Sequence, residues 1–306
     1  NNTEYFPPRR FADYKGTDEV NMTNNVLLFH MNTTSGNLND YSGNGYTAAL
    51  QDSSRIFYNN EGRIGMAVNF TNTANNHNGG FGISAGTSSK LNIGTGNQGT
   101  VCAWVYPTDL GVNEEGFVVK ANATASFEYG LHTLAAPLTP VFSIFATIQR
   151  SVTSSVNMRA YYWNFLCGTF ITNNSINIYL DGVLTNTVAW AGWGNPRVAT
   201  SDLNLGREYV NVTGNRQGMH GRLDEVAIWN VSFTGDEIKK AYMLGTARFF
   251  PMNRTTASTV QLMDYFSDED STVAFNNSNN YAKFDSDGDY LRLQNFSDFR
   301  NIEKNT

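Results

Sequence analysis

The apolar residues of this chain occur in short runs, and turn-forming glycine and asparagine separate them. Ile176, Ile178 and Leu180 alternate with less apolar positions, and Asp181-Gly182 ends the run. This period of two predicts a half-buried β-strand. Similar runs recur at residues 26–31, 65–70, 100–106, 115–120, 127–131, 141–148, 161–171, 203–206 and 221–229. Many short strands separated by turns predict an all-β sandwich or jelly roll.

The composition agrees with this fold class and excludes several partners. Charged residues make up 16% of the chain, against about 25% in an ordinary soluble protein. Asn, Thr, Ser and Gly supply the polar surface instead, and these residues favour turns. The net charge is −6 without a basic cluster, so a nucleic-acid partner is not expected. No run approaches the roughly 18 apolar residues of a membrane span.

One helix is predicted after the last strand of this series. Thr234-Gly235-Asp236-Glu237 has the form of a capping box, with a threonine N-cap and a glutamate at the third helical position. Ile238, Ala241 and Tyr242 give an apolar stripe, and Gly245 is a natural C-terminal cap. We expect this short helix to pack on the sandwich.

Seven segments resemble, in order, motifs of the laminin-G-like domain of the concanavalin A-like lectin/glucanase superfamily. Ile178-Tyr179-Leu180-Asp181-Gly182 and the segment 221–230, Gly-Arg-Leu-Asp-Glu-Val-Ala-Ile-Trp-Asn, carry the resemblance most closely. The other similar segments are residues 40–45, 65–70, 101–107, 163–170 and 203–206. The resemblance implies a concanavalin A-like jelly roll over residues 24–247, preceded by an extended segment at residues 1–23.

The tail, residues 248–306, carries a second and partial resemblance. Residues 280–293 are similar to an early hairpin of the same family, which predicts a linker and the start of a second copy. An unpaired hairpin is a template for strand addition. We therefore hypothesise that residues 280–296 dock onto the first domain or onto another molecule.

The superfamily includes glucanases, so an enzyme is one alternative. Glycoside hydrolysis requires two carboxylates that flank one bond. The run Glu-x-Asp-x-x-Glu of the hydrolytic members is missing, and the adjacent Asp224 and Glu225 point to opposite faces of a strand. The histidines have neither metal-type nor triad spacing; they are His30, His77, His132 and His220. The sequence therefore predicts a non-enzymatic protein.

The resemblance makes a structural calcium ion a candidate cofactor. It implies Asp40, Ser42, Asn44 and Asp224 as ligands, and hard oxygen ligands of this kind suit Ca²⁺. The alternative is that an aspartate in a turn accepts hydrogen bonds from local backbone N–H groups.

Carbohydrate binding requires exposed aromatic rings beside hydrogen-bonding groups. Trp190 and Trp193 lie in a glycine-rich loop and are the candidate glycan contacts. The alternative is that they cover the core or an intersubunit contact. Trp104, Trp163 and Trp229 fall in predicted strands, so we expect them in the core.

Cysteines and glycosylation sequons bear on the location of the protein. Cys102 and Cys167 are either one disulfide or two buried thiols, because sequence alone cannot place their Cα atoms. Asn-x-Ser/Thr sequons are in modest excess, which favours an extracellular, glycosylated surface protein. They lie at Asn1, Asn21, Asn32, Asn69, Asn122, Asn173, Asn211, Asn230, Asn253, Asn276 and Asn295.

Two hypotheses of different classes follow. The first is a structural or adhesive module of the cell surface, which contacts its own copies or neighbouring surface proteins through sheet edges. The second is a lectin-like module that binds glycans through Trp190 and Trp193. Exposed tryptophans would favour the lectin, and buried tryptophans would favour the building block.

Overall fold

The computed structural model describes most of the chain, in two compact units. The larger unit is Arg10–Tyr242, and the smaller combines Asn1–Arg9 with Met243–Thr306. The described residues are 3–6, 20–50, 56–59, 61–71, 83–108, 114–122, 126–134, 137–198, 201–207, 218–246, 248–251, 261–263, 272–276 and 281–283.

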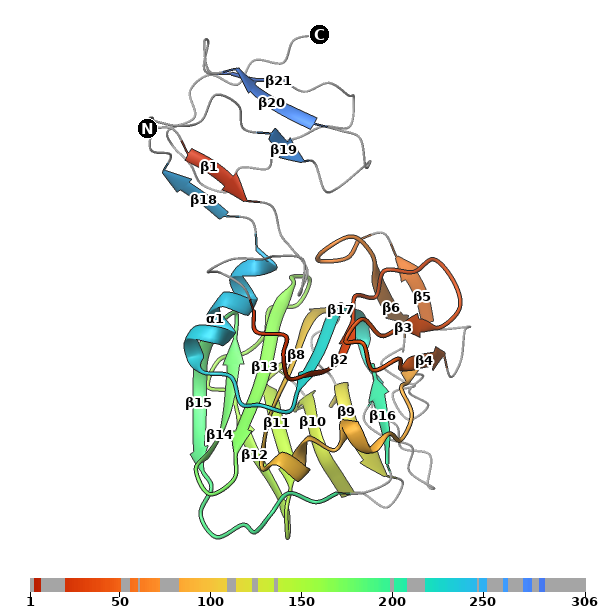
Figure 1. The fold of residues 1–306 in the computed structure, drawn as a ribbon, viewed down its shortest axis with the longest axis vertical. Coiled ribbons are helices and arrows are strands. Elements are labelled where there is room, and N and C mark those ends of the chain that lie inside the picture. The colour runs from red at the N-terminus through yellow and green to blue at the C-terminus, as the bar shows by residue number, and fades with distance from the viewer. Residues whose placement is uncertain are drawn as a thin grey trace. The chain divides into compact units, whose positions relative to one another are not determined.

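The larger unit is a sandwich of two antiparallel sheets (Figure 1). The first sheet has the order β12 (Gln149–Thr153), β11 (Pro140–Phe145), β10 (Ser126–Thr133), β9 (Gly116–Asn122), β16 (Asp202–Leu205), β7 (Ile83–Ser84), β4 (Thr47–Leu50) and β3 (Leu38–Asn39). The second has the order β15 (Val183–Ala189), β14 (Ser175–Leu180), β13 (Asn164–Ile171), β8 (Gln98–Pro107), β17 (His220–Trp229), β6 (Ala67–Thr71) and β5 (Ile56–Asn59), and β2 (Asn25–Phe29) pairs with β17. The predicted all-β jelly-roll sandwich is confirmed.

The central strands of the second sheet are buried on both faces. Along β8, Val101, Ala103 and Val105 belong to the core between the sheets. Successive side chains of a strand point to opposite faces, so Cys102 and Trp104 lie on the outer face, yet they are also buried. Another layer of the chain must therefore cover this outer face.

Glycine is required where the two sheets approach most closely. A Cβ atom on Gly168 of β13 would lie 2.1 Å from the ring of Phe142 in β11. Phe142 is fully buried, so it has little room to move away. The sandwich can close at this point only because one sheet presents no side chain.

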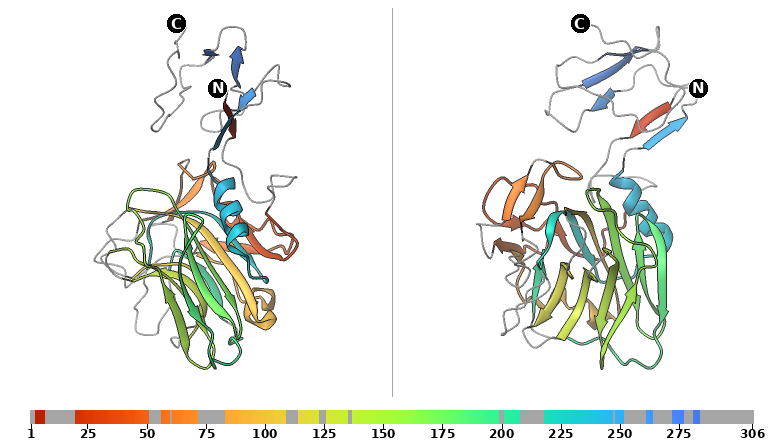
Figure 2. Two further views of the ribbon diagram at one scale, coloured as in Figure 1. Left: turned by 90° about the vertical axis from the view of Figure 1, so that its left-hand side faces the viewer. Right: turned by 180° about the vertical axis from the view of Figure 1, so that it is seen from behind.

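Helix α1 (Gly235–Leu244) covers part of the outer face (Figure 2). The ring of Tyr242 stacks on Trp104 at 5.7 Å between centroids and lies 6.1 Å from Phe165. The predicted capping box is confirmed, because Thr234 N donates to Glu237 Oε2 at 2.7 Å and Glu237 N donates to Thr234 Oγ1 at 3.3 Å. No helix in the described ranges is long and apolar enough to cross a membrane.

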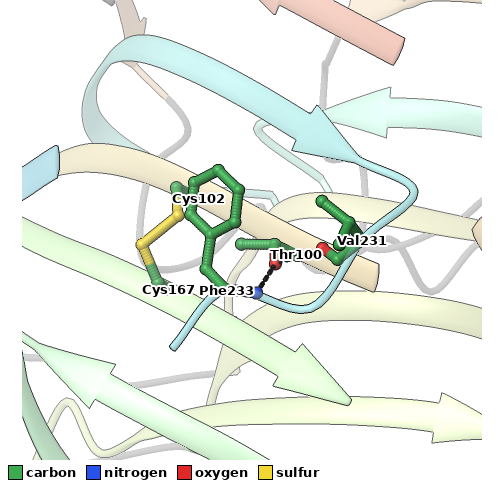
Figure 3. The surroundings of a disulfide bond; sticks show 5 residues. All are labelled: Thr100, Cys102, Cys167, Val231 and Phe233. Atoms are coloured by element: carbon green, nitrogen blue, oxygen red, sulfur yellow. Dashed lines mark hydrogen bonds between the residues drawn. A yellow bond between two sulfur atoms is a disulfide. The ribbon is translucent and has the colours of Figure 1, made fainter. Parts of the chain in front are cut away.

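The two cysteines form a disulfide on the same outer face (Figure 3). Cys102 of β8 lies directly opposite Cys167 of β13 in the strand register, with 4.2 Å between the Cα atoms. The segment after β17 runs beside this bond, and Phe233 N donates to Thr100 Oγ1 at 2.9 Å. The crosslink thus fixes the register of two central strands.

The smaller unit contains short strands. Thr3–Phe6, which lies in the predicted extended N-terminal segment, forms β1 and pairs with β18 (Arg248–Pro251). In addition, β20 (Thr272–Asn276) pairs with β19 (Gln261–Met263) and β21 (Tyr281–Lys283). The rest of residues 280–296 lies outside the described residues, so the partial second copy and its docking stay predictions.

Replacing both cysteines with alanine should destabilise the sandwich. The disulfide joins residues 65 apart in sequence, and loss of such a crosslink costs about 2–4 kcal/mol of unfolding free energy. Urea unfolding of the double variant and of the wild-type protein measures this difference. Alkylation in denaturant followed by mass spectrometry provides the control, because two alkylated thiols in unreduced protein would contradict the crosslink.

His132 should make the fold less stable in acid. Burial lowers the pKa of His132 from 6.5 to about 4, and its Nε2 lies 2.8 Å from Ser143 Oγ. The unfolded chain binds this proton at a higher pH than the folded chain does. The stabilisation is therefore complete above pH 6.5 and decreases as the pH falls towards 4, by at most about 3 kcal/mol.

Urea unfolding at pH 7, 5.5 and 4 tests this expectation against the His132→Gln variant, which cannot titrate. The wild-type protein should lose more stability than the variant over this range. Equal losses would contradict the assignment.

Candidate functional site

The structure places Trp190, a predicted glycan contact, in the core. Trp190 is 3% exposed, its ring stacks on Phe170 at 6.0 Å, and its Nε1 donates to Gly194 O at 3.1 Å. Trp193 is half-buried, with its ring 5.3 Å from Trp190 and the Arg150 guanidinium 4.9 Å above it. Of the two alternatives for Trp190, the exposed platform is wrong and the core position is confirmed, because the loop folds back onto Phe170. This burial argues against a lectin site at Trp190.

The turn that contains Asp40 is held by hydrogen bonds within the protein. Asp40 Oδ1 accepts from Leu28 N and Ser42 N, both at 2.9 Å, and Oδ2 accepts from Ser42 Oγ at 2.7 Å. Asn44 Nδ2 donates to Val26 O at 3.1 Å. Backbone and hydroxyl donors therefore occupy both carboxylate oxygens, and this donor set does not fit a calcium cage.

Asp224, the fourth implied calcium ligand, is also engaged within the fold. It is fully buried, and its oxygens accept from Ile64 N at 3.0 Å and Glu225 N at 2.8 Å. Burial, and secondly the neighbouring charge of Glu225, raises the pKa of Asp224 well above its usual range. Glu225 in turn lies 2.8 Å from His30 Nδ1. Within the described segments, no three His, Cys, Asp or Glu side chains form a group that could hold a metal.

Several predicted sequons are accessible on the larger unit. The exposed sequon asparagines among the described residues are Asn21, Asn32, Asn173 and Asn230. Asn69 is half-buried in β6. Asn122 and Asn276 lie in strands whose side chains at these positions are not described, whereas Asn1, Asn211, Asn253 and Asn295 lie outside the described residues. Their glycosylation stays a prediction.

A different surface gathers exposed aromatic rings, at the turn of residues 159–163 before β13. Tyr161 and Tyr162 are 57% and 55% exposed. Tyr161 has a φ of +61°, in the left-handed region that a bulky side chain rarely adopts. Its backbone N–H donates to Pro107 O at 2.7 Å. The turn is thus fixed to the end of β8.

Asn164 holds this turn from inside the protein. It is 1% exposed, its Oδ1 accepts from Arg159 N at 2.9 Å, and its Nδ2 donates to Arg159 O at 3.0 Å and Tyr162 O at 2.7 Å. One buried amide therefore closes the turn at both ends and holds the backbone from which the two tyrosines project.

Arginines lie on or beside the rings of this surface. The Arg159 guanidinium is 5.0 Å from the Tyr162 centroid, and the Arg222 guanidinium is 4.9 Å from that of Tyr106. Tyr106 also contacts Trp163 at 5.5 Å between centroids. We call this set the aromatic–arginine surface; it consists of Tyr106, Arg159, Tyr161, Tyr162, Trp163 and Arg222.

The sequence interpretation missed this surface, and its prediction that Trp163 is a core residue is wrong. Trp163 is half-exposed and precedes β13, which begins at Asn164. The predicted strand began at residue 161, whereas the structure has a turn there and β13 begins at Asn164.

The aromatic–arginine surface is suited to binding. It offers ring faces, phenol hydroxyls and guanidinium N–H donors, which are groups that recognise an amphipathic ligand. Its geometry therefore provides contacts and orientation for a ligand.

Comparisons with solved structures support the fold assignment. Domain 4 of AbnA, an extracellular arabinanase of Geobacillus stearothermophilus, was solved in complex with arabinotriose. Its sequence is 15% identical and the TM-score is 0.53, and the alignment covers 71% of this chain and 98% of that domain. The binding domain of Paraclostridial Mosquitocidal Protein 1 is 14% identical with a TM-score of 0.56 over 72% of this chain. A structure of botulinum neurotoxin type C, whose cell entry is described as dependent on interaction with two ganglioside molecules, is 10% identical with a TM-score of 0.56 over 74% of this chain.

This chain spans about half of each toxin domain, 52% in both cases. At such identities the likeness establishes the fold alone. No curated protein matches the chain.

The sequence itself matches a family model over residues 77–239, just over half of the chain. That model, Laminin_G_3, describes the concanavalin A-like lectin/glucanases superfamily. The matched region runs from before β8 to within α1 and so contains the disulfide, the 159–163 turn and β17. The chain therefore belongs to the Laminin_G_3 family of the concanavalin A-like lectin/glucanase superfamily.

Proposed function

We propose that this chain is a non-catalytic, extracellular glycan-recognition module, and that the aromatic–arginine surface is its binding site. One observation carries the proposal. Tyr161 and Tyr162 are each more than half exposed, yet a buried asparagine holds their turn rigidly. A turn whose backbone is fixed in advance loses little backbone entropy on binding.

A sugar matches the chemistry of this surface. Its C–H face is apolar and packs on an aromatic ring, whereas its hydroxyls need hydrogen-bonding partners at the ring edge. The Tyr161 and Tyr162 hydroxyls and the Arg159 guanidinium supply such partners. The Arg159 side chain is 65% exposed, so a ligand can reach it.

The comparisons agree with binding as the class of function. The arabinanase domain was solved with an oligosaccharide, and the type C toxin domain is described with gangliosides. Their low identity transfers no residue, so the site on this chain rests on its own geometry. A single disulfide and several exposed sequons favour an extracellular location.

A cell-surface building block is the second candidate, because β15 ends its sheet and exposes Val183 and Leu184 by 64% and 48%. The protein itself occupies part of this edge, since Ser155 Oγ donates to Thr185 O at 2.6 Å. Light scattering of the intact protein, with and without EDTA, separates the candidates. Polymers would favour the building block, and their loss in EDTA would restore the calcium hypothesis.

Replacing Tyr161 should weaken glycan binding without unfolding the protein. Tyr161→Asn removes the ring but keeps a residue that tolerates the left-handed conformation. After an array of glycans identifies a ligand for the intact chain, titration calorimetry should give roughly tenfold weaker binding, the effect of losing about 1.4 kcal/mol. Thermal unfolding should be unchanged or shifted upwards.

Ile148→Ala is the matched control for this experiment. Ile148 is 51% exposed and lies beside the Trp193 loop, to which Thr147 N donates at 3.3 Å, at the opposite end of the sandwich. Its binding should equal that of the wild-type protein. If no glycan binds, or if Tyr161→Asn binds as the control does, the proposed site is wrong.

A further inference from the structure

The guanidinium of Arg159 has unused hydrogen-bonding capacity. Its side chain is 65% exposed, and its nearest acidic group is Asp181, with 3.8 Å between Nη2 and Oδ2. This distance is too long for a hydrogen bond. Asp181 Oδ1 already accepts from Phe165 N at 2.9 Å. Within the described part of the chain, Arg159 has no closer carboxylate.

The position of Arg159 is nevertheless well defined. Asn164 binds its backbone at both N and O, and its guanidinium lies 5.0 Å from the Tyr162 centroid. The ring face attracts the cation, whereas the exposed N–H groups of the guanidinium can still donate hydrogen bonds. The structure therefore presents a planar set of donors next to an exposed aromatic ring.

Arg159 already acts on one carboxylate of the protein. Burial raises the pKa of Asp181, and the hydrogen bond from Phe165 N and the charges of Arg159 and Arg63 oppose this rise. An exposed guanidinium of this kind also attracts an anionic ligand.

We infer that the ligand of the aromatic–arginine surface is an acidic glycan whose sugar carboxylate binds the paired N–H donors of the Arg159 guanidinium. This inference rests on the proposed glycan-binding function and specifies its ligand class. A carboxylate and a guanidinium match in two parallel N–H···O bonds, which adds both strength and orientation. The adjacent tyrosine rings would take the sugar face next to the carboxylate.

Pairs of oligosaccharides that differ only at the carboxyl group test the inference. The probes are an oligogalacturonide and its carboxyl-reduced form, and sialyllactose and its carboxyl-reduced form, titrated into the intact chain. At least one acidic probe should bind, and carboxyl reduction should weaken its binding at least tenfold. Raising the salt from 50 to 500 mM should also weaken it, because screening reduces the attraction of exposed charges.

Variants of Arg159 assign the effect to this residue. Arg159→Gln should bind the acidic and the reduced probe equally weakly, and Arg159→Lys should regain only part of the difference, because lysine has the charge without the paired N–H donors. Arg197→Gln is the matched control. The Arg197 guanidinium lies 5.3 Å from the Phe145 centroid, and this variant should bind as the wild-type protein does.

The possible failures are distinguishable. If acidic and reduced probes bind the wild-type protein equally and Tyr161→Asn weakens both, the glycan site stands and the acidic ligand is wrong. Tighter binding of an oligosaccharide that carries sulfate but no carboxylate would also overturn the carboxylate assignment. Binding that survives in Arg159→Gln would remove Arg159 from the site. If no probe binds and the glycan array is also negative, the proposed function itself fails.

Discussion

Burial of the central strands of the second sheet on both faces is the constraint on which the rest of the structure depends. Trp104 points away from the inter-sheet core and is still only 2% exposed, because Tyr242 of α1 and Phe165 pack on it. Further along β8, Tyr106 contacts Trp163, and both side chains are only partly buried. The candidate binding surface therefore adjoins a packed aromatic layer.

Asn164 connects the stability of this layer to the geometry of the site. It is the first residue of β13 and lies opposite Val105 in the register with β8. Its amide would be costly to bury without partners, and the 159–163 turn supplies them through Arg159 and Tyr162. The hydrogen bonds that satisfy a buried polar group thus also orient the side chains that face solvent.

Local patterns were sufficient to predict the sandwich and the helix, but not the site. The alternation in β14 and the capping box at Thr234 depend on nearby residues only. The exposure of a tryptophan depends on distant ones. Trp163 is only partly buried because β13 begins after it, at Asn164. Trp190 is buried because the loop folds back through Gly192 and Gly194, with φ values of +65° and +72°. Neither outcome can be read from the flanking sequence.

The backbone of Tyr161 agrees with the proposed binding site. A left-handed conformation costs a non-glycine residue about 1–2 kcal/mol, and glycine or asparagine would adopt it more cheaply. The tyrosine ring recovers little of this cost within the fold, because the side chain is 57% exposed. The hydrogen bonds of Asn164 offset the strain but do not require a tyrosine. Strain that persists around an exposed ring is typical of functional sites, and it agrees with selection of this ring for a contact outside the chain.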